Sequence, residues 1–361
     1  MKSVHAAFSD RYAQARRQFL AAAQAAGLAV TSHMHPLTGS EGEPLAMDVA
    51  REGDANASRV LLVTSACHGV EGHCGSGVQV HALGDEAWRE AARQAGVAVV
   101  YVHALNPHGF SHGRRVTHEN VDINRNFHDF SQPLPDNPAY REVHALLMPD
   151  VWPPDAQNQQ AVANYIATHG MPRFQAAVSG GQHEFEDGLF YGGRAPTWSN
   201  LQLRAVLREH AGACQQLAWV DLHTGLGPTG VGERIYAGAD DAQAVARARA
   251  WWGQGVTSIY DGSSTSALLT GLMWTAVKDE CPQAEYTGIA LEYGTQPIEQ
   301  ILYALRGDHW LHQHPDAPTE LARSIRQTMK QAFYVDTDAW RVQIVTQAMD
   351  ALHLAVKGLR G

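Results

Sequence analysis

Residues 59–66 read RVLLVTSA, a continuous apolar run of the length that one buried strand needs. Runs without polar alternation are typical of strands covered on both faces, as in parallel sheets. Similar runs occur at 97–104 (VAVVYVHA), 216–222 (QLAWVDL) and 287–293 (TGIALEY). Helical patterns fill most of the sequence between them. The alternation predicts an α/β fold with a mostly parallel central sheet.

Weaker patterns extend this prediction toward both ends of the chain. His5–Ala26 is expected to form an amphipathic helix ended by Gly27, and short extended runs follow at Leu28–His33 and Leu45–Ala50. Residues 105–138 have little regular pattern, and a polar loop of this length is usually functional or disordered. Further helices are expected at 75–83, 86–95, 139–147, 157–169, 198–210 and 240–252, with three more after Pro297.

The length of the chain and the lack of breaks indicate one domain. At roughly 150 residues per domain, 361 residues correspond to one large domain or two small ones. No repeat, low-complexity segment or linker forces a boundary. We therefore expect a single domain over residues 1–361, with the motifs described below within 67–295 and C-terminal helices at 296–358 packed on it.

The composition excludes several classes of protein. Hydrophobic residues make up 45% and charged residues 18%, which permits a sizeable core and excludes a mainly disordered chain. The 27 Lys and Arg against 37 Asp and Glu give a net charge of −10, which argues against a nucleic-acid or membrane partner. No segment reads as a signal peptide or a transmembrane helix, and the four cysteines are too scattered for a disulfide framework. A cytoplasmic location is expected, and the oligomeric state stays open.

Polar side chains mark the ends of three of the four strongest strands, and a glycine follows each of them within two residues. These ends read His68-Gly69, His223-Thr224-Gly225 and Glu292-Tyr293-Gly294. In open α/β sheets, ligands bind beyond the carboxyl ends of the parallel strands. The sequence therefore predicts a functional site at this edge of the sheet.

The first two polar residues have a spacing suited to a metal. His68 and Glu71 stand three positions apart in a glycine-flanked turn, so both side chains can point at one place. A catalytic zinc typically has three protein ligands and one open position. His223, arriving from another strand end, would complete a set of two histidines and one glutamate. The alternative is a capped turn with a solvated His and Glu.

The long polar loop supplies the second group of candidates. Arg125 offers a planar fork of donors that matches a carboxylate, and Asn124 adds amide donors beside it. Arg114 and Arg115 lie just upstream and could polarise a substrate carbonyl. The alternatives are an Asx-rich turn with a surface arginine and a solvated charge pair. Glu292 ends an apolar strand, so it needs a partner, a cleft or a role as a base.

Four motifs in order resemble one known group of enzymes. They are ACHGVEG (66–72), ENVDINRNF (119–127), VDLHTG (220–225) and ALEYGT (290–295). Together they resemble the zinc carboxypeptidase superfamily, which includes the metallocarboxypeptidases and the succinylglutamate desuccinylase/aspartoacylase amidases. The chain looks most like a bacterial branch known mainly as a domain of unknown function. The resemblance implies one three-layer α/β/α domain around a mixed sheet of about eight strands.

The resemblance also implies roles for the candidate residues. His68, Glu71 and His223 match the three ligands of one zinc ion, and Glu292 matches the general base that activates water. Asn124 and Arg125 match the pair that binds a substrate's terminal carboxylate. Arg115 best fits the arginine that polarises the scissile carbonyl, with Arg114 a close rival. The implied activity is zinc-dependent hydrolysis of an amide next to a free carboxylate, by a metallopeptidase of the carboxypeptidase type.

Several alternatives stay open. The substrate could be a peptide or, as in the desuccinylase and aspartoacylase branch, an N-acyl amino acid. Carboxypeptidases use a mobile tyrosine, and the sequence does not decide between Tyr236, Tyr260 and Tyr286. A non-catalytic, zinc-containing binding protein is the alternative from another class. A serine or cysteine esterase on an α/β fold is a third.

Overall fold

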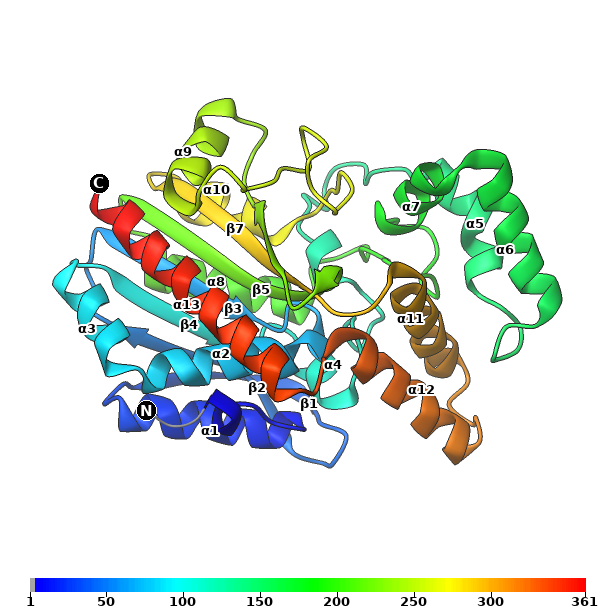
Figure 1. The fold of residues 1–361 in the computed structure, drawn as a ribbon, viewed down its shortest axis with the longest axis horizontal. Coiled ribbons are helices and arrows are strands. Elements are labelled where there is room, and N and C mark those ends of the chain that lie inside the picture. Colours follow the sequence, from blue (N-terminus) through cyan, green and yellow to red (C-terminus); the bar gives the residue numbers. More distant parts are fainter. Residues whose placement is uncertain (1–3) are drawn as a thin grey trace.

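A mixed sheet of seven strands crosses residues 4–361, the part of the chain that this computed structural model describes (Figure 1). The strands lie in the order β1-β2-β4-β3-β5-β7-β6. β4, β3, β5 and β7 are parallel, whereas β1, β2 and β6 join the edges in antiparallel pairs. The prediction of an α/β fold is confirmed, with seven strands where about eight were expected. The strands are β1 (Val30–Thr38), β2 (Pro44–Glu52), β3 (Arg59–Ser65), β4 (Ala98–His103), β5 (Gln216–Thr229), β6 (Gly232–Tyr236) and β7 (Glu285–Gly294).

β3 contributes side chains to both hydrophobic cores, because successive residues of a strand point to opposite faces. Leu61 and Val63 belong to the core under one layer of helices, whereas Val60 and Leu62 belong to the core on the other face. The first layer holds α1 (Tyr12–Ala25), α2 (Gly72–Gly84), α3 (Glu86–Gln94), α9 (Ala242–Trp252) and α13 (Asp338–Arg360). The second holds α8 (Trp198–Ala211) and α10 (Ala276–Glu280). The expected three-layer α/β/α arrangement is confirmed.

A group of five helices forms a lobe at one end of the sheet, on the right of Figure 1. Phe174, Leu305 and Met329 are among the residues of its own core, which also includes Val70 from the turn after β3. α11 follows β7 directly, so the lobe lies at the end toward which the parallel strands point. The helices are α5 (Pro138–Leu147), α6 (Ala156–His169), α7 (Met171–Ser179), α11 (Ile298–Gln313) and α12 (Thr319–Phe333).

Some elements differ from the sequence-based expectation. The expected helix over His5–Ala26 is divided into η1 (Val4–Ala7) and α1, because Arg11 at the start of α1 is extended. The loop at 105–138 contains α4 (Pro107–His112) and η3 (Ile123–Arg125), and neither α7 nor β6 was expected. The three C-terminal helices are confirmed. Within residues 4–361, no helix is long and apolar enough to cross a membrane.

Candidate metal centre

The turn after β3 places His68 and Glu71 at the edge of the sheet. His68 precedes η2 (Gly69–Glu71), and two backbone hydrogen bonds tie this turn to the arginine segment. Gly69 N donates to Arg115 O at 3.0 Å, and Val70 N donates to Arg114 O at 2.9 Å. A Cβ at Gly69 would lie 2.1 Å from the backbone carbonyl carbon of Gly109. The close approach therefore favours glycine at position 69.

The three expected metal ligands converge around the carboxylate of Glu71. His68 Nδ1 lies 2.8 Å from Glu71 Oε1, and His223 Nδ1 lies 3.0 Å from Glu71 Oε2. The ligand atoms of all three lie within 4.8 Å of one another, and all three side chains are buried. Burial opposes ionisation of Glu71, but the two imidazoles outweigh it and hold the pKa of this carboxyl below its ordinary value. The donor set and its charge fit a catalytic zinc.

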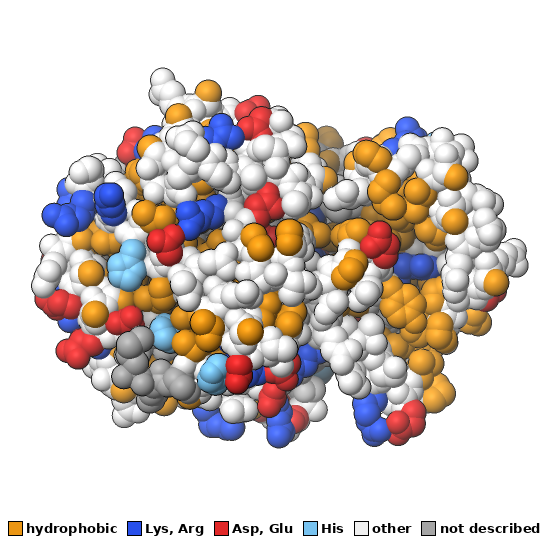
Figure 2. Space-filling view, in the orientation of Figure 1, with side chains coloured by type: hydrophobic (Ala, Val, Ile, Leu, Met, Phe, Trp, Pro, Cys, Tyr) orange, Lys and Arg blue, Asp and Glu red, His pale blue; other side chains and the backbone are white. Residues whose placement is uncertain are grey.

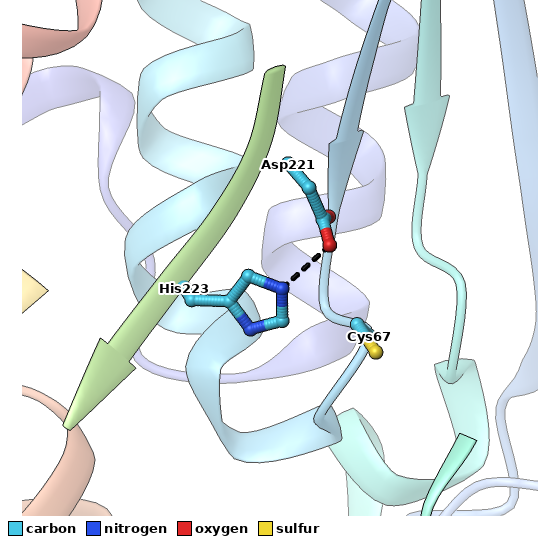
Figure 3. Close-up of side chains that lie close together, drawn as sticks. All are labelled: Cys67, Asp221 and His223. Carbon is cyan, nitrogen blue, oxygen red and sulfur yellow. Dashed lines mark hydrogen bonds and ion pairs between the residues drawn. The ribbon is translucent and has the colours of Figure 1, made fainter. Parts of the chain in front are cut away.

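Two aspartates that the sequence analysis did not single out hold the far nitrogens of the imidazoles. His68 Nε2 lies 3.3 Å from Asp122 Oδ1, and His223 Nε2 lies 2.5 Å from Asp221 Oδ2 (Figure 3). Histidine ligands typically donate their second ring N–H to a carboxylate, which fixes the tautomer and orients the ring. Both aspartates lie inside the quoted motifs, two residues before Asn124 and two residues before His223. The sequence signal for these two aspartates is therefore a carboxylate inside a motif that also holds a candidate site residue.

Cys67, Asp221 and His223 form a second close group of possible ligands. Figure 3 shows a hydrogen bond between Asp221 and His223 and none to Cys67. Burial and the surrounding carboxylates raise the pKa of the Cys67 thiol well above its ordinary value. Because the thiolate is the form that binds metal, a neutral thiol makes a poor ligand here. Of the two groups, the one with His68 and Glu71 has the two histidines and one glutamate that are typical of a catalytic zinc.

Glu292 faces the same place from the neighbouring strand. It is the register partner of His223 in the parallel β5–β7 pair, and its Oε1 accepts a hydrogen bond from Leu226 N at 2.9 Å. Burial, followed by the negative charge of Glu71, raises the pKa of Glu292 to about 7. A carboxyl group with a pKa near neutrality is suited to accept and release a proton.

The structure separates the two arginines that the sequence left as rivals. Arg115 lines the cavity in front of His68 and contacts Glu71 Oε1 at 3.2 Å and Asp122 Oδ2 at 3.1 Å. Arg114 points away and pairs with Asp308 of α11 at 3.1 Å. Arg115 is therefore the arginine that the structure brings to the metal centre, and Arg114 is not.

Asn124 and Arg125 also line the cavity, and both are held by backbone groups. Arg125 donates to Ser179 O from Nε (3.2 Å) and Nη2 (2.7 Å), and to Asn124 O from Nη1 (2.8 Å). Asn124 Oδ1 accepts a hydrogen bond from Met273 N at 3.0 Å. The guanidinium has five N–H donors, and these bonds use three, which leaves two for a bound anion.

The cavity that joins these residues has a volume of about 400 Å³. Tyr236 and Tyr286 line it, but Tyr236 Oη already donates to Ala239 O at 3.0 Å. Tyr260 does not line it, and its hydroxyl donates to Gly238 O at 2.9 Å. None of the three candidate tyrosines is placed beside the metal ligands by a contact in the described residues.

Comparison with known proteins gives one family and several solved structures. The family described as "Protein of unknown function (DUF2817)" matches residues 8–347, and no curated protein matches the chain. A metallo-carboxypeptidase from Burkholderia cenocepacia is 13% identical, with 96% of this chain and 68% of that chain covered and a TM-score of 0.41. Bovine thrombin-activatable fibrinolysis inhibitor is 12% identical, with 98% and 99% covered and a TM-score of 0.41. The family match agrees with the domain-of-unknown-function branch that the four motifs resemble.

Proposed function

The chain belongs to the family described as Protein of unknown function (DUF2817), and we propose that it is a zinc-dependent hydrolase. The bond cleaved is an amide next to a free carboxylate, as in a carboxypeptidase substrate. One observation carries the proposal: His68, Glu71 and His223 converge at a cavity that Glu292 and Arg125 also line. A ligand set, a base and a free cationic fork in one cavity are the parts that this reaction needs.

Zinc would be held by Nδ1 of His68, Nδ1 of His223 and the carboxylate of Glu71. When bound, it would supply Lewis acidity for the hydrolytic water and the scissile carbonyl. With a proton on each Nε2, Asp122 and Asp221 would accept from it, and both Nδ1 lone pairs would be free for a metal in place of the present contacts with Glu71.

The chain's own residues supply the remaining steps. The two free N–H groups of Arg125 bind the substrate carboxylate and place the neighbouring amide over Glu292. Glu292 takes a proton from water as the water oxygen bonds to the carbonyl carbon. The carbon–nitrogen bond then breaks, and Glu292 gives that proton to the leaving amine. The products are a carboxylic acid and a free amino acid.

Arg115 has to exchange partners before it can act on the substrate. It donates to Glu71, Asp122 and His68 Nε2, the last at 2.7 Å. Once Nε2 of His68 carries a proton, it cannot accept from Arg115, and this contact would then be released. The freed Nη2 would then be available to the oxyanion that forms on the carbonyl.

Glu292→Gln tests the proposal. The variant should retain one zinc per chain by mass spectrometry and lose activity toward N-acylated dipeptides by about 10²–10⁴-fold. The same dipeptides with an amidated C-terminus should not be cleaved by the wild type, because Arg125 then has no anion to bind. Undiminished turnover by the variant would remove Glu292 from this role.

The remaining alternatives are distinguished by the same assays. Tight binding of a C-terminal peptide without cleavage by the zinc-loaded wild type would identify a binding protein. Inhibition by a serine- or thiol-directed reagent, with chelators inert, would identify an esterase. His223→Ala is the control for the metal, because it removes one of three ligands and should abolish zinc binding.

A further inference from the structure

The cavity has two differently made parts, which we call its arms. One arm lies over the sheet and is lined by residues that precede His223 and Glu292 on their strands, including Trp219 and Ala290. The other arm lies beyond the strand ends, against the helical lobe. It is lined by α6, α7 and α11, through Val162, Ile166, Met171, Phe174, Ile298 and Leu302. We refer to these six residues as the helix arm.

The helix arm is mainly apolar, although Gln175, Tyr303 and Glu299 of the same helices also line the cavity. The nearest cation on α11, Arg306, is already bound to Leu147 O at 2.9 Å, Leu146 O at 2.9 Å and Asn158 Oδ1 at 2.6 Å. Glu299, the carboxylate that lines this part of the cavity, is exposed at its rim. An anionic ligand segment would therefore find no free cation along this wall except at the arginines beside the metal centre.

The apolar surface of this arm is also incompletely covered by the protein itself. α6 has no fully buried residue, although Val162 and Ile166 lie on it. Met171 and Ile298 are each 43% exposed, which places both among the more exposed large hydrophobic residues of the chain. Figure 2 shows hydrophobic side chains gathered at the lobe, over α11 and beside the hollow that separates the lobe from the rest of the molecule. An apolar group bound there would remove this surface from water.

Resting on the proposed function, we infer that the acyl side of the substrate is an uncharged alkyl chain bound by the helix arm. The substrate class is then an N-acyl amino acid with a medium-length or long acyl chain. An extended peptide fits less well, because most of its N–H and C=O groups would lie against apolar side chains that cannot pair with them. A succinyl group fits less well because its distal carboxylate would have no cation. The amino acid part keeps its carboxylate on Arg125.

The size of the arm sets the chain length. Met171, Phe174 and Val178 lie on one side of α7, and seven helical residues rise by about 10 Å. Along such a wall each added methylene should raise kcat/KM by about threefold to fourfold, the factor that corresponds to ~0.8 kcal/mol per buried CH₂. The gain should stop once the chain passes the end of the wall.

A series of N-acyl phenylalanines tests the inference on the zinc-loaded protein. Acetyl, butanoyl, hexanoyl and octanoyl substrates should show rising kcat/KM, and the succinyl substrate should lie near the acetyl one. Ile298→Arg should remove most of the octanoyl advantage and raise activity on the succinyl substrate, because it puts a cation on the wall. Val342→Arg is the matched control, since Val342 is 44% exposed on α13 and does not line the cavity. Ile166→Gln, a half-buried uncharged change, should also reduce the octanoyl advantage.

Binding to Glu292→Gln separates this inference from the proposed function. The dissociation constant for N-octanoyl phenylalanine should be at least tenfold lower than for the acetyl compound, and Ile298→Arg in the same background should remove the difference. Chain-length-dependent binding without hydrolysis by the wild type would support the helix arm and contradict the hydrolase. Equal binding and equal hydrolysis of the acetyl and octanoyl compounds would overturn the helix arm alone.

Discussion

Asp122 and Asp221 orient the imidazole rings of His68 and His223. Each contacts an Nε2, and each has further partners: Asp122 Oδ1 accepts from Asn124 N at 2.9 Å, and Asp221 Oδ1 accepts from Thr64 Oγ1 at 2.5 Å. A carboxylate fixed in this way holds the ring orientation and raises the basicity of the ligand nitrogen. The metal affinity of the candidate site should therefore depend on Asp122 and Asp221, although neither is a proposed ligand.

Asp122→Asn and Asp221→Asn should each weaken zinc binding by about 10–100-fold while the protein stays folded. The amide keeps the shape of the side chain but loses the charge that supports a protonated Nε2. Competition with a chromophoric chelator measures the affinity, and the far-ultraviolet circular dichroism spectrum measures the fold. Asp129→Asn, an exposed change in the same loop, should have no effect. Unchanged affinity in both buried variants would contradict the orienting role.

The pKa of Glu292 sets the acid side of the pH profile. Burial and the charge of Glu71 raise this pKa to about 7 when no metal is bound, and a cation between the ligands stabilises the carboxylate and lowers it. The base must be deprotonated to act, so kcat/KM should fall as pH drops, with an apparent pKa below about 7. This fall of kcat/KM at low pH should be absent from the residual activity of Glu292→Gln. Activity that rises between pH 7 and 5 would contradict the assignment.

Sequence alone could place the candidate ligands at one edge of the sheet but not the contacts of the arginines. His68 and Glu71 follow the end of β3, His223 and Glu292 are register partners within β5 and β7, and the parallel pairing brings them to one edge. Arg114 and Arg115 are adjacent in sequence and point to opposite sides of the same segment. Which of them faces the metal depends on Asp308, which lies 194 residues further along on α11. No local pattern contains that information.

The turn between β3 and α2 is the element on which the metal centre depends most. It joins a strand to a helix within a few residues and is held against α4 by the close approach of Gly69 to Gly109. α4 itself has clear local signals: Asn106 caps it, Pro107 is its first residue, and Gly113 ends it with a φ of +66°. These signals were present in a loop expected to be irregular. The local signals for α7 and β6 were weaker. The sequence of β6, GERIY, is polar for a strand, which suits its place at the edge of the sheet.

Gly69→Ala should impair the metal centre more than the fold. The added Cβ meets backbone atoms of Gly109 at 2.1–2.4 Å, so the turn must shift and move His68 and Glu71 relative to His223. We expect a loss of roughly 1–3 kcal/mol of stability and a drop in zinc affinity, measured by urea unfolding and chelator competition. Gly84→Ala is the control, because a Cβ there meets no atom within 4 Å. Equal effects of the two changes would show that the turn tolerates displacement.

The whole molecule combines a sheet, which supplies the chemistry, with a lobe, which closes one side of the cavity. The lobe comes from two segments far apart in sequence, α5–α7 at 138–179 and α11–α12 at 298–333. Helical periodicity predicted most of these helices but not their meeting, since an amphipathic pattern shows which side is apolar and not what covers it. The shape of the cavity therefore had to come from the structure. Packing among the helices and strands also leaves His103 of β4 and His309 of α11 almost fully buried.

These two histidines should make the protein less stable in mild acid. Burial is the main cause that lowers the pKa of each from 6.5 to about 4, so both are neutral in the folded protein at pH 6. The unfolded chain takes up protons near pH 6.5, whereas the folded protein does so only near pH 4. Stability is therefore full above about pH 6.5, falls as pH drops through this window, and falls no further from this source below about pH 4. The loss is at most roughly 3 kcal/mol for each histidine.

The slope of stability against pH isolates this effect from all others. Urea unfolding of the metal-free protein between pH 7 and 4 should give a steeper decline for the wild type than for His103→Gln, whatever the stability of the variant at pH 7. His353→Gln changes a histidine on the exposed face of α13 and should leave the slope unchanged. His103 stacks on Phe19 with ring centres 4.7 Å apart and bonds Ser76 Oγ at 2.9 Å, so a proton on its free nitrogen would be buried without a partner. A slope shared by all three proteins would mean that His103 is solvated before the molecule unfolds, and that the β4 face of the core opens locally in acid.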